Sequence, residues 1–404
     1  MKVLVLNAGS SSVKYQLIIP EERKVLAKGL VERIGLSGAM LSHETFDKSP
    51  VKMTGEILDH RVAIEYVLSI LLSPRHGVLK DKNEIDAVGH RVVHGGEAFS
   101  GSVLINSDMI NEMTKCIDFA PLHNPPNLKG IAAAKSLLPD VPQVGVFDTA
   151  FHQTMPSHAY IYGLPYTLYK RHGIRRYGFH GTSHRYVAHR AAELVNKPLK
   201  ELKIITCHLG NGSSIAAVKD GQSIDTSMGF TPLEGLLMGT RTGDMDPAII
   251  LHIMGKEDLS PGEMNTMLNK HSGILGVSGI SSDMREIEEK YHLNDRAKLA
   301  MDIFIYRIKK YIGAYTAAMG GTDIIVFTAG IGENSDMVRE MTCSDMEFLG
   351  IKLDKNKNKT SRKKEAIITT EDSRVKVMVI PTNEELVIAL DTAEIVRELH
   401  KQPV

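Results

Sequence analysis

Two short runs of apolar, mostly β-branched residues open the chain, and a Gly/Ser turn separates them. Residues 3–8 and 13–18 predict two strands, with Gly9-Ser10-Ser11-Ser12 as the turn. Such a turn exposes backbone N–H groups and serine hydroxyls, and Lys14 adds a positive charge, so it is suited to hold phosphate. Taken alone, this segment is explained equally well as a phosphate-binding turn or as an ordinary polar hairpin loop. The arrangement recurs over residues 204–218, which favours two similar lobes facing one nucleotide.

The remaining pattern alternates between buried strands and amphipathic helices. It predicts core-facing helices over 54–72 and 296–318 and helix starts near 182, 281 and 382, where residues 382–385 form a capping box. It predicts buried strands over 85–92, 144–147, 324–328 and 375–380. Between these elements we expect a rigid proline loop at 121–127, a long functional connection at 225–247, a glycine turn at 329–334 and a basic surface turn at 355–364.

Length and composition indicate how many domains the chain forms and which partners and compartment it is suited to. A chain of 404 residues is too long for one ordinary core, so we expect an N-terminal lobe over 1–150 and a C-terminal lobe over 151–382, with the terminal helix 383–404 belonging partly to the first. Lys plus Arg and Asp plus Glu both number 48, so no global field favours nucleic acid or an anionic membrane. Three widely spaced cysteines and the lack of a signal peptide or spanning segment predict a cytoplasmic protein.

Two arginines in apolar or glycine-rich surroundings are candidate anion clamps. Arg91 lies within the predicted strand 85–92, and Arg241 lies between two threonines of the long connection. A buried guanidinium needs an anion, which is either a carboxylate of the protein or a bound carboxylate or phosphate. The sequence leaves both possibilities open.

Three further residues stand where strands and helices meet. Asp148 follows a buried strand, where open α/β sheets place ligands, although a helix-capping role explains it as well. His180 lies between glycines that permit close approach of a ligand. Glu384 either complements a helix dipole or binds Mg²⁺. His90 and His94 are not expected to share a zinc ion, because residues four apart on a strand are separated by roughly 13 Å.

The glycine turns do not match common nucleotide fingerprints. No Walker A motif occurs, and neither Gly210-Asn211-Gly212 nor Gly330-Ile331-Gly332 continues as a dinucleotide fingerprint. A repeated hairpin with phosphate turns instead resembles the superfamily of sugar kinases, actin and Hsp70-type ATPases. Within it, residues 7–14, 89–96, 147–152, 177–184, 208–214, 239–244 and 330–334 resemble, in order, the motifs of the acetate kinase family.

This resemblance implies an α/β fold of two similar lobes, each a mixed β-sheet flanked by helices of the duplicated ribonuclease H-like type. It implies reversible, Mg-dependent transfer of the ATP γ-phosphoryl group to acetate by direct in-line transfer between the lobes, giving acetyl phosphate and ADP. Mg²⁺ is the expected metal, with Mn²⁺ as an alternative. The resemblance also suggests a homodimer, without nucleic-acid or membrane partners.

The site residues carried over from the family fall into four groups. The phosphoryl group is expected to meet Asp148, His180, Arg241 and Arg91. Acetate is expected at Arg91, Val93, Leu122, Phe179 and Pro232. The nucleotide is expected at Ser10, Ser12, Lys14, His208, Leu209, Gly210, Asn211, Gly212, Asp283, Met284, Arg285, Ile331, Gly332, Glu333, Asn334 and Ser335, and the metal at Asn7 and Glu384.

Two alternatives remain at this point. A propionate or butyrate kinase of the same family differs by methylene groups, which a pocket discriminates by only ~1 to 3 kcal/mol each. An actin- or Hsp70-like protein that uses ATP as a switch has no evident use for Arg91, His180 and Arg241 together, and the chain carries no added peptide-binding domain.

Overall fold

The computed structural model describes residues 1–401, which divide into two compact units. Unit 1 comprises residues 1–153 together with the segment that begins at Asn383, and unit 2 comprises Thr154–Thr382. None of the described helices combines the length and apolar composition that a bilayer-spanning helix requires.

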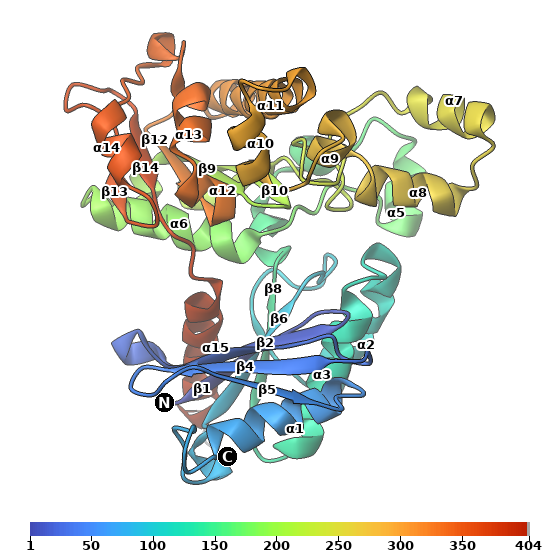
Figure 1. Cartoon of the computed structure of the whole chain (residues 1–404), viewed down its shortest axis with the longest axis vertical. Coiled ribbons are helices and arrows are strands. Elements are labelled where there is room, and N and C mark those ends of the chain that lie inside the picture. Colours follow the sequence, from blue (N-terminus) through green and yellow to red (C-terminus); the bar gives the residue numbers. More distant parts are fainter. Residues whose placement is uncertain (402–404) are drawn as a thin grey trace. The chain divides into compact units, whose positions relative to one another are not determined.

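Unit 1 is built on a mixed sheet in the order β5-β4-β3-β2-β1-β6-β8-β7. Its strands are β1 (Val3–Ala8), β2 (Ser12–Ile19), β3 (Lys24–Glu32), β4 (Ala39–Thr45), β5 (Val51–Gly55), β6 (Ala87–Val92), β7 (Val103–Leu104) and β8 (Gln143–Phe147). Its helices are α1 (His60–Leu71), α2 (Ser107–Lys115), α3 (Asn124–Leu137) and α15 (Glu384–Lys401). Helices α1 and α3 cover one face of the sheet, and α15 returns from the end of the chain to cover the other (Figure 1).

Unit 2 is built on a second mixed sheet in the order β11-β10-β9-β12-β14-β13. Its strands are β9 (Lys203–Leu209), β10 (Ser213–Lys219), β11 (Gln222–Thr226), β12 (Ile324–Thr328), β13 (Ala366–Ile367) and β14 (Lys376–Val379). Its helices are α4 (Ser157–Tyr160), α5 (Tyr166–His172), α6 (Gly181–Leu194), α7 (Ala248–Glu257), α8 (Pro261–Lys270), α9 (Gly273–Ser278), α10 (Met284–Lys290), α11 (Asp295–Met319), α12 (Ala329–Asn334), α13 (Asp336–Cys343) and α14 (Lys355–Thr360).

The two sheets share one topology, which confirms the predicted pair of similar α/β lobes. In each, the first three strands of the shared core (β1, β2, β3 and β9, β10, β11) form an antiparallel meander. The first strand of each meander then pairs in parallel with a later strand, β6 or β12, which pairs in parallel with β8 or β14. The two predicted phosphate turns occupy equivalent positions, between β1 and β2 and between β9 and β10.

The long helix α11 supplies much of the core of unit 2. Its predicted apolar face is buried almost throughout, against alternate residues of β9 and against α13. Gly320 ends the helix in the left-handed conformation (φ 69°), which glycine adopts at little cost. The opposite face of β9 is covered by α6, where His184 of α6 bonds Thr206 of β9 and His208 of β9 bonds Ser183 of α6.

Several predicted boundaries are wrong. The helix predicted over 54–72 begins at His60, because Thr54 pairs in β5 and Asp59 caps the helix by accepting from the Val62 N–H. The predicted proline loop becomes helical at Asn124, since proline fits the first turn of a helix. The predicted glycine turn at 329–334 is the short helix α12.

The end of the chain also differs from the predicted capping box. The Leu386 N–H donates to the side chain of Asn383, so Asn383 caps α15 in place of Thr382. The Thr382 hydroxyl instead bonds Ser183, 2.8 Å away. The basic segment 355–364 is partly helical, as α14, rather than a simple turn.

Candidate functional site

A glycine turn, a histidine and an arginine converge in unit 2. The turn between β9 and β10 is closed by hydrogen bonds from the Gly210 N–H to the Gly212 carbonyl (3.2 Å) and from the Ser213 hydroxyl to the Gly210 carbonyl (2.9 Å). A Cβ atom added to Gly212 would lie 3.4 Å from Arg241 Nη1 and 3.8 Å from His180 Nε2. Both nitrogens therefore face the same small volume beside the turn.

Arg241 is half-buried and has no acidic partner among the residues that the structure describes. Its Nη1 donates to the Pro232 carbonyl at 3.3 Å and contacts the Met238 sulfur at 3.9 Å. Burial lowers the pKa of the guanidinium. Because a desolvated cation is costly unless an anion neutralises it, this arginine is poised for an anionic ligand.

His180 precedes α6 in the left-handed conformation, with φ 58°. Its Nδ1 lies 2.9 Å from the Ser214 hydroxyl, and its ring stacks on His208 with centroids 4.0 Å apart. His208 in turn lies 2.8 Å from the Ser183 hydroxyl. The ring of His180 is thus held on one edge and one face, and its Cε1–Nε2 edge lies beside Gly212, which Arg241 Nη1 also approaches.

A charged cluster lies in unit 1 where β6, β8 and α15 meet. Arg91 forms two hydrogen bonds with Asp148, from Nε to Oδ1 (3.1 Å) and from Nη2 to Oδ2 (2.7 Å), and its Nε lies 3.8 Å from Glu384. Asp148 raises the pKa of the guanidinium, against the opposing effect of burial. Lys14 pairs with Glu385. The protein's own carboxylate thus occupies the Arg91 fork, which was one of the two predicted possibilities.

The same cluster holds the expected metal ligands. Burial raises the pKa of Glu384; Arg91 opposes this, while Asp148 and Glu385 reinforce it. The described residues contain no group of three His, Cys, Asp or Glu side chains arranged around a metal. Mg²⁺ commonly uses one or two carboxylates and completes its shell with water and phosphate oxygens. Asn7 pairs with Lys14 across β1 and β2, so it lies beside this cluster, in which Glu384 is one of three carboxylates. The oxygens of Glu384 and Asn7 fit such a hard divalent ion.

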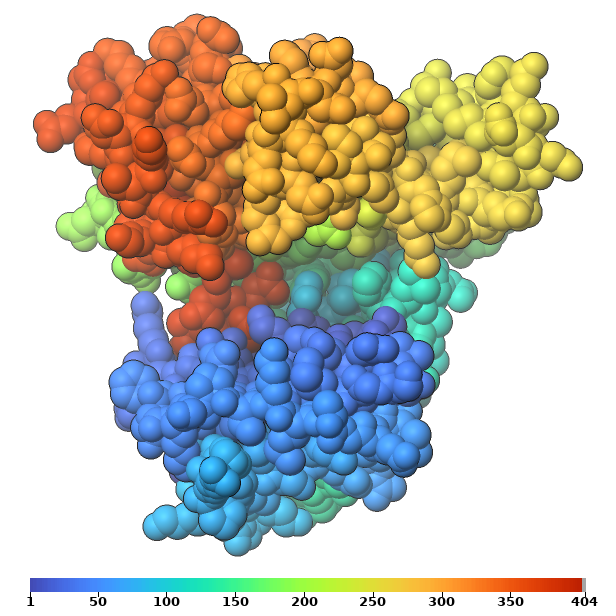
Figure 2. All heavy atoms as spheres, in the orientation of Figure 1, coloured from blue at the N-terminus to red at the C-terminus, as the bar shows by residue number. Residues whose placement is uncertain are grey.

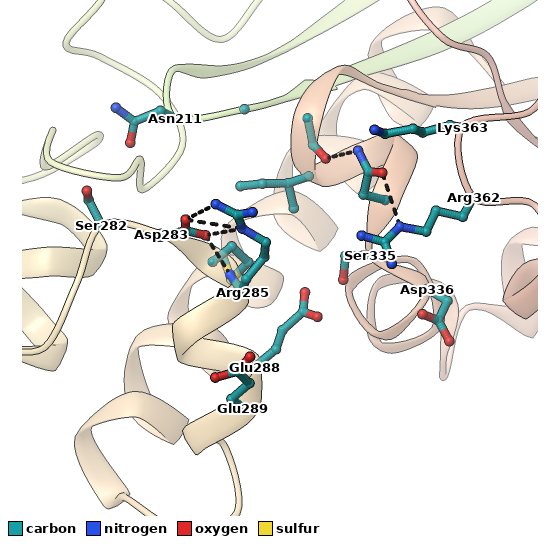
Figure 3. Close-up of a pocket in the computed structure, with 15 residues that line it drawn as sticks. Asn211, Ser282, Asp283, Arg285, Glu288, Glu289, Ser335, Asp336, Arg362 and Lys363 are labelled. Atoms are coloured by element: carbon teal, nitrogen blue, oxygen red, sulfur yellow. Dashed lines mark hydrogen bonds and ion pairs between the residues drawn. The ribbon is translucent and has the colours of Figure 1, made fainter.

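A pocket of about 720 Å³ opens in unit 2 beside the glycine turn. In Figure 3, Asp283 pairs with Arg285 on one wall, and Ser335, Arg362 and Lys363 lie on the other. Eight of the predicted nucleotide residues line this pocket: Gly210, Asn211, Asp283, Met284, Arg285, Ile331, Asn334 and Ser335.

Other predicted nucleotide residues lie outside this pocket. Leu209 is fully buried in the core, Gly332 gives its carbonyl to Arg339, and the Glu333 carboxylate accepts from the Ala329 and Thr382 N–H groups. These positions support the pocket rather than line it. Ser10, Ser12 and Lys14 belong to unit 1.

Seven residues outside the predicted set of nucleotide contacts also line the pocket, of which Gly330 belongs to the predicted glycine turn. They are Ser282, Glu288, Glu289, Gly330, Asp336, Arg362 and Lys363. Glu288 is notable, because burial raises the pKa of its carboxyl group while a hydrogen bond with Ser335 opposes the shift. The basic segment 355–364, which the sequence indicated only as a solvated surface, contributes Arg362 and Lys363. No pattern in the sequence distinguishes these two from their charged neighbours.

The residues expected around the acetate methyl group are divided between the units. Val93 is half-buried at the end of β6, where its N–H donates to Asn127 of α3, and Leu122 is 66% exposed. Phe179 is buried in unit 2, and Pro232 is tied to Arg241 through its carbonyl. Neither unit by itself brings all four together.

Comparison with known proteins identifies the class. The sequence profile of the acetokinase family matches residues 2–390. An acetate kinase of Carboxydothermus hydrogenoformans is 62% identical over 397 residues, covering 98% of this chain and 99% of that protein. The crystal structure of Porphyromonas gingivalis acetate kinase aligns with a TM-score of 0.94 at 53% identity, covering 98% of this chain and 99% of the other.

A propionate kinase from Francisella tularensis aligns with a TM-score of 0.91 at 44% identity, covering 97% of this chain and 99% of the other. The fold and these relatives define a phosphotransferase with a carboxyl group as acceptor. The chain belongs to the acetokinase family.

Proposed function

We propose that this protein catalyses reversible transfer of the γ-phosphoryl group of ATP to acetate, giving acetyl phosphate and ADP. The observation that carries this proposal is Arg241, a half-buried cation without an acidic partner in the described chain, whose Nη1 faces the same volume as His180 Nε2 beside the glycine turn. This arrangement suits a transferring phosphoryl group, which carries negative charge on its equatorial oxygens.

Acetate needs no general base in this reaction. A carboxyl group of pKa near ~4 is ionised at neutral pH, so the nucleophile already carries its negative charge. The obstacle is repulsion between the anionic acetate and the anionic phosphate. Arg91 and Arg241 reduce that repulsion, and Asp148 orients the Arg91 guanidinium through two hydrogen bonds rather than accepting a proton.

The pocket beside α10 and α12 takes the nucleoside, and the turn at 210–212 takes the phosphates through the backbone N–H groups of Asn211 and Gly212. We assign the divalent cation as Mg²⁺, held by Glu384 and Asn7, with Mn²⁺ as an alternative. When bound, such an ion neutralises phosphate oxygens and orients them. Glu385 holds Lys14 close to this cluster.

The test is formation of an acyl phosphate, trapped as the hydroxamate, with Mg-ATP and acetate, propionate or butyrate. We expect the highest kcat/KM with acetate. A higher value with propionate would move the substrate assignment to the longer acid, as in the Francisella tularensis relative. Failure of all three acids to react would overturn the carboxylate kinase assignment.

We also infer a homodimer in the cytoplasm. The three cysteines are all free and buried, which suits a reducing compartment. Helix α7 supports self-association, because none of its residues is fully buried and Leu251 is 75% exposed. The segment with α7 and α8, yellow in Figure 2, projects from one end of unit 2. Closed symmetric dimers commonly bury such apolar surfaces.

A further inference from the structure

A chain of hydrogen bonds runs beneath the phosphate turn, between α6 and the sheet of unit 2. Thr206 Oγ1 lies 2.7 Å from His184 Nδ1, and His184 Nε2 lies 2.8 Å from Ser214 Oγ. Ser214 Oγ is also 2.9 Å from His180 Nδ1. Thr206, His184 and Ser214 are completely buried, so water does not replace any of these bonds.

The direction of this chain follows from its first member. The Thr206 hydroxyl has one proton, and within residues 1–401 its side-chain partner is His184 Nδ1. A buried hydroxyl proton without an acceptor is costly, so Thr206 donates to Nδ1. A neutral His184 then carries its own proton on Nε2 and donates it to Ser214.

The direction continues to His180. Ser214 accepts from His184, so the single proton of its hydroxyl is available for His180 Nδ1. A His180 ring that accepts at Nδ1 carries its proton on Nε2, which is the nitrogen beside Gly212 and Arg241. That N–H is then a donor toward the volume that we assign to the transferring phosphoryl group.

We propose that Thr206, His184 and Ser214 are positioning residues that hold neutral His180 in the Nε2-protonated tautomer and fix the direction of its N–H. Stacking on His208 fixes the plane of the ring, and the bond from Ser214 fixes its rotation within that plane. Groups that face His180 include His208 from β9, Ser214 from β10 and, across the space beside Gly212, Arg241 from the loop after β11; His184 reaches it through Ser214. The catalytic benefit of this arrangement rests on the proposed function, whereas the tautomer itself does not.

The direct test is nitrogen NMR of the ligand-free, full-length protein with ¹⁵N-labelled histidine at about pH 9, where histidine rings are largely neutral. The His180 signals are identified by their loss in His180→Gln. We expect Nε2 protonated in the parent protein and a mixture of tautomers in Thr206→Val, which removes the first donor with little change of shape. Thr226→Val is the matched control, because Thr226 is also a buried strand threonine but donates to the Ile215 carbonyl.

A parent ring protonated on Nδ1, or an unchanged tautomer in Thr206→Val, would overturn the proposal. Since this measurement requires no substrate, its result tests the proposed tautomer of His180 independently of the acetate kinase assignment.

Kinetics provide a second test through Ser214→Ala. We expect kcat to fall about 10- to 100-fold with less than about a twofold change in the KM for acetate or ATP, because the donor is misdirected while the binding groups remain. Ser227→Ala is the control, since Ser227 is equally buried but accepts from the Ile215 N–H. Equal kcat in the two variants, or a loss confined to KM, would contradict a positioning role.

Discussion

At the scale of single residues, Arg241 is the side chain whose contribution to catalysis can be tested most directly. Its guanidinium is half-buried, and no carboxylate in the described chain neutralises it. We predict that Arg241→Ala lowers kcat by about 10³-fold or more, as for arginine fingers, while ATP affinity changes by less than about threefold. Steady-state kinetics and calorimetric titration with ATP measure the two effects separately.

The matched control for Arg241→Ala is Arg190→Ala. Arg190 pairs with Glu193 and Glu365 on the surface of unit 2, away from the glycine turn, so its loss should leave kcat unchanged. If Arg241→Ala weakens ATP binding as strongly as it lowers kcat, Arg241 binds the ground state and the phosphoryl assignment is wrong.

Asp148 tests whether the reaction needs a proton acceptor. We predict that Asp148→Asn lowers kcat by about 100-fold, because Arg91 loses its charged bidentate partner and its fork is no longer held in place. The shape of the kcat profile between about pH 6 and 9 should match that of the parent, since acetate is already ionised there. Asp59→Asn, which preserves the cap of α1, is the control. Loss of one limb of the profile in Asp148→Asn would identify Asp148 as a base.

The sequence predicted which residue types carry the chemistry better than it predicted their partners. A buried Arg91 needed an anion, and the sequence allowed either a protein carboxylate or a bound ligand. Only the folded structure shows that the Arg91 guanidinium bonds the carboxylate of Asp148. Glu288 and Arg362 were missed for a related reason. Each is an ordinary charged residue in its local sequence, and only the tertiary arrangement of α10 and the segment after α14 makes it part of the pocket wall.

At the scale of elements, α12 and α14 are joined by one buried arginine. Arg339 of α13 donates to the Gly332 carbonyl at 2.8 Å and to both the side chain and the carbonyl of Asn358. We predict that Arg339→Met lowers the free energy of unfolding by about 3 kcal/mol, because these buried acceptors lose their donor. It should also weaken ATP binding, since α12 lines the nucleotide pocket. Urea unfolding and ATP titration provide the measurements.

Arg362→Met is the control for this element. Arg362 also lies at the pocket, but it is exposed and bonds only the Asn334 side chain in the described structure, at 3.3 Å. It should leave the free energy of unfolding within about 0.5 kcal/mol of the parent. A stability loss in Arg339→Met without any change in ATP affinity would show that α12 does not need this support to bind the nucleotide.

The errors in predicted elements share a cause. Thr54 was the predicted first residue of the helix, yet its pairing with Met40 places it in β5. Residues 124–127 contain two prolines and suggested a loop, although the first turn of a helix tolerates them. In both cases the local pattern allowed two structures, and long-range contacts selected one. The period of α11 had no such competitor, and its predicted bounds differ by one residue at each end.

For the molecule as a whole, the repeated turn was the most informative feature of the sequence. A hairpin with a Gly/Ser turn occurring twice predicted two similar lobes, and both sheets indeed contain the same five-stranded core. The added strands β4 and β5 of unit 1 could not be predicted in the same way, because no strand in the described sheet of unit 2 repeats them. The amino-acid composition gives a net charge of zero, but it does not indicate how the helices and strands are arranged.

The exposed apolar surface of α7 gives a prediction about assembly. If α7 lies in the dimer interface, Leu251→Asp should convert the dimer to a monomer, because an isologous interface places the new charge there twice. Sedimentation velocity measures the change. Leu293→Asp is the control, at an exposed leucine of the loop between α10 and α11. A dimer that survives Leu251→Asp but dissociates in Leu293→Asp would move the interface away from α7.

The stability of the whole chain should depend on pH through His90. This residue is buried in β6 with Nε2 2.8 Å from Gln143, and burial lowers its pKa to about 4 while that hydrogen bond opposes the shift. An unfolded histidine has a pKa near ~6.5, so between these values the unfolded chain binds a proton that the folded chain does not. The free energy of unfolding should therefore fall by up to about 3 kcal/mol as the pH decreases from about 6.5 to 4. Urea unfolding of the parent and of His90→Gln across this range isolates the effect, because all other titrating groups contribute equally to both.

We expect the free energy of unfolding to depend less on pH in His90→Gln. The control is His252→Gln, at an exposed histidine, which should leave the pH dependence of the parent unaltered. Parallel curves for the parent and His90→Gln would show that His90 is protonated in the folded state as readily as in the unfolded chain.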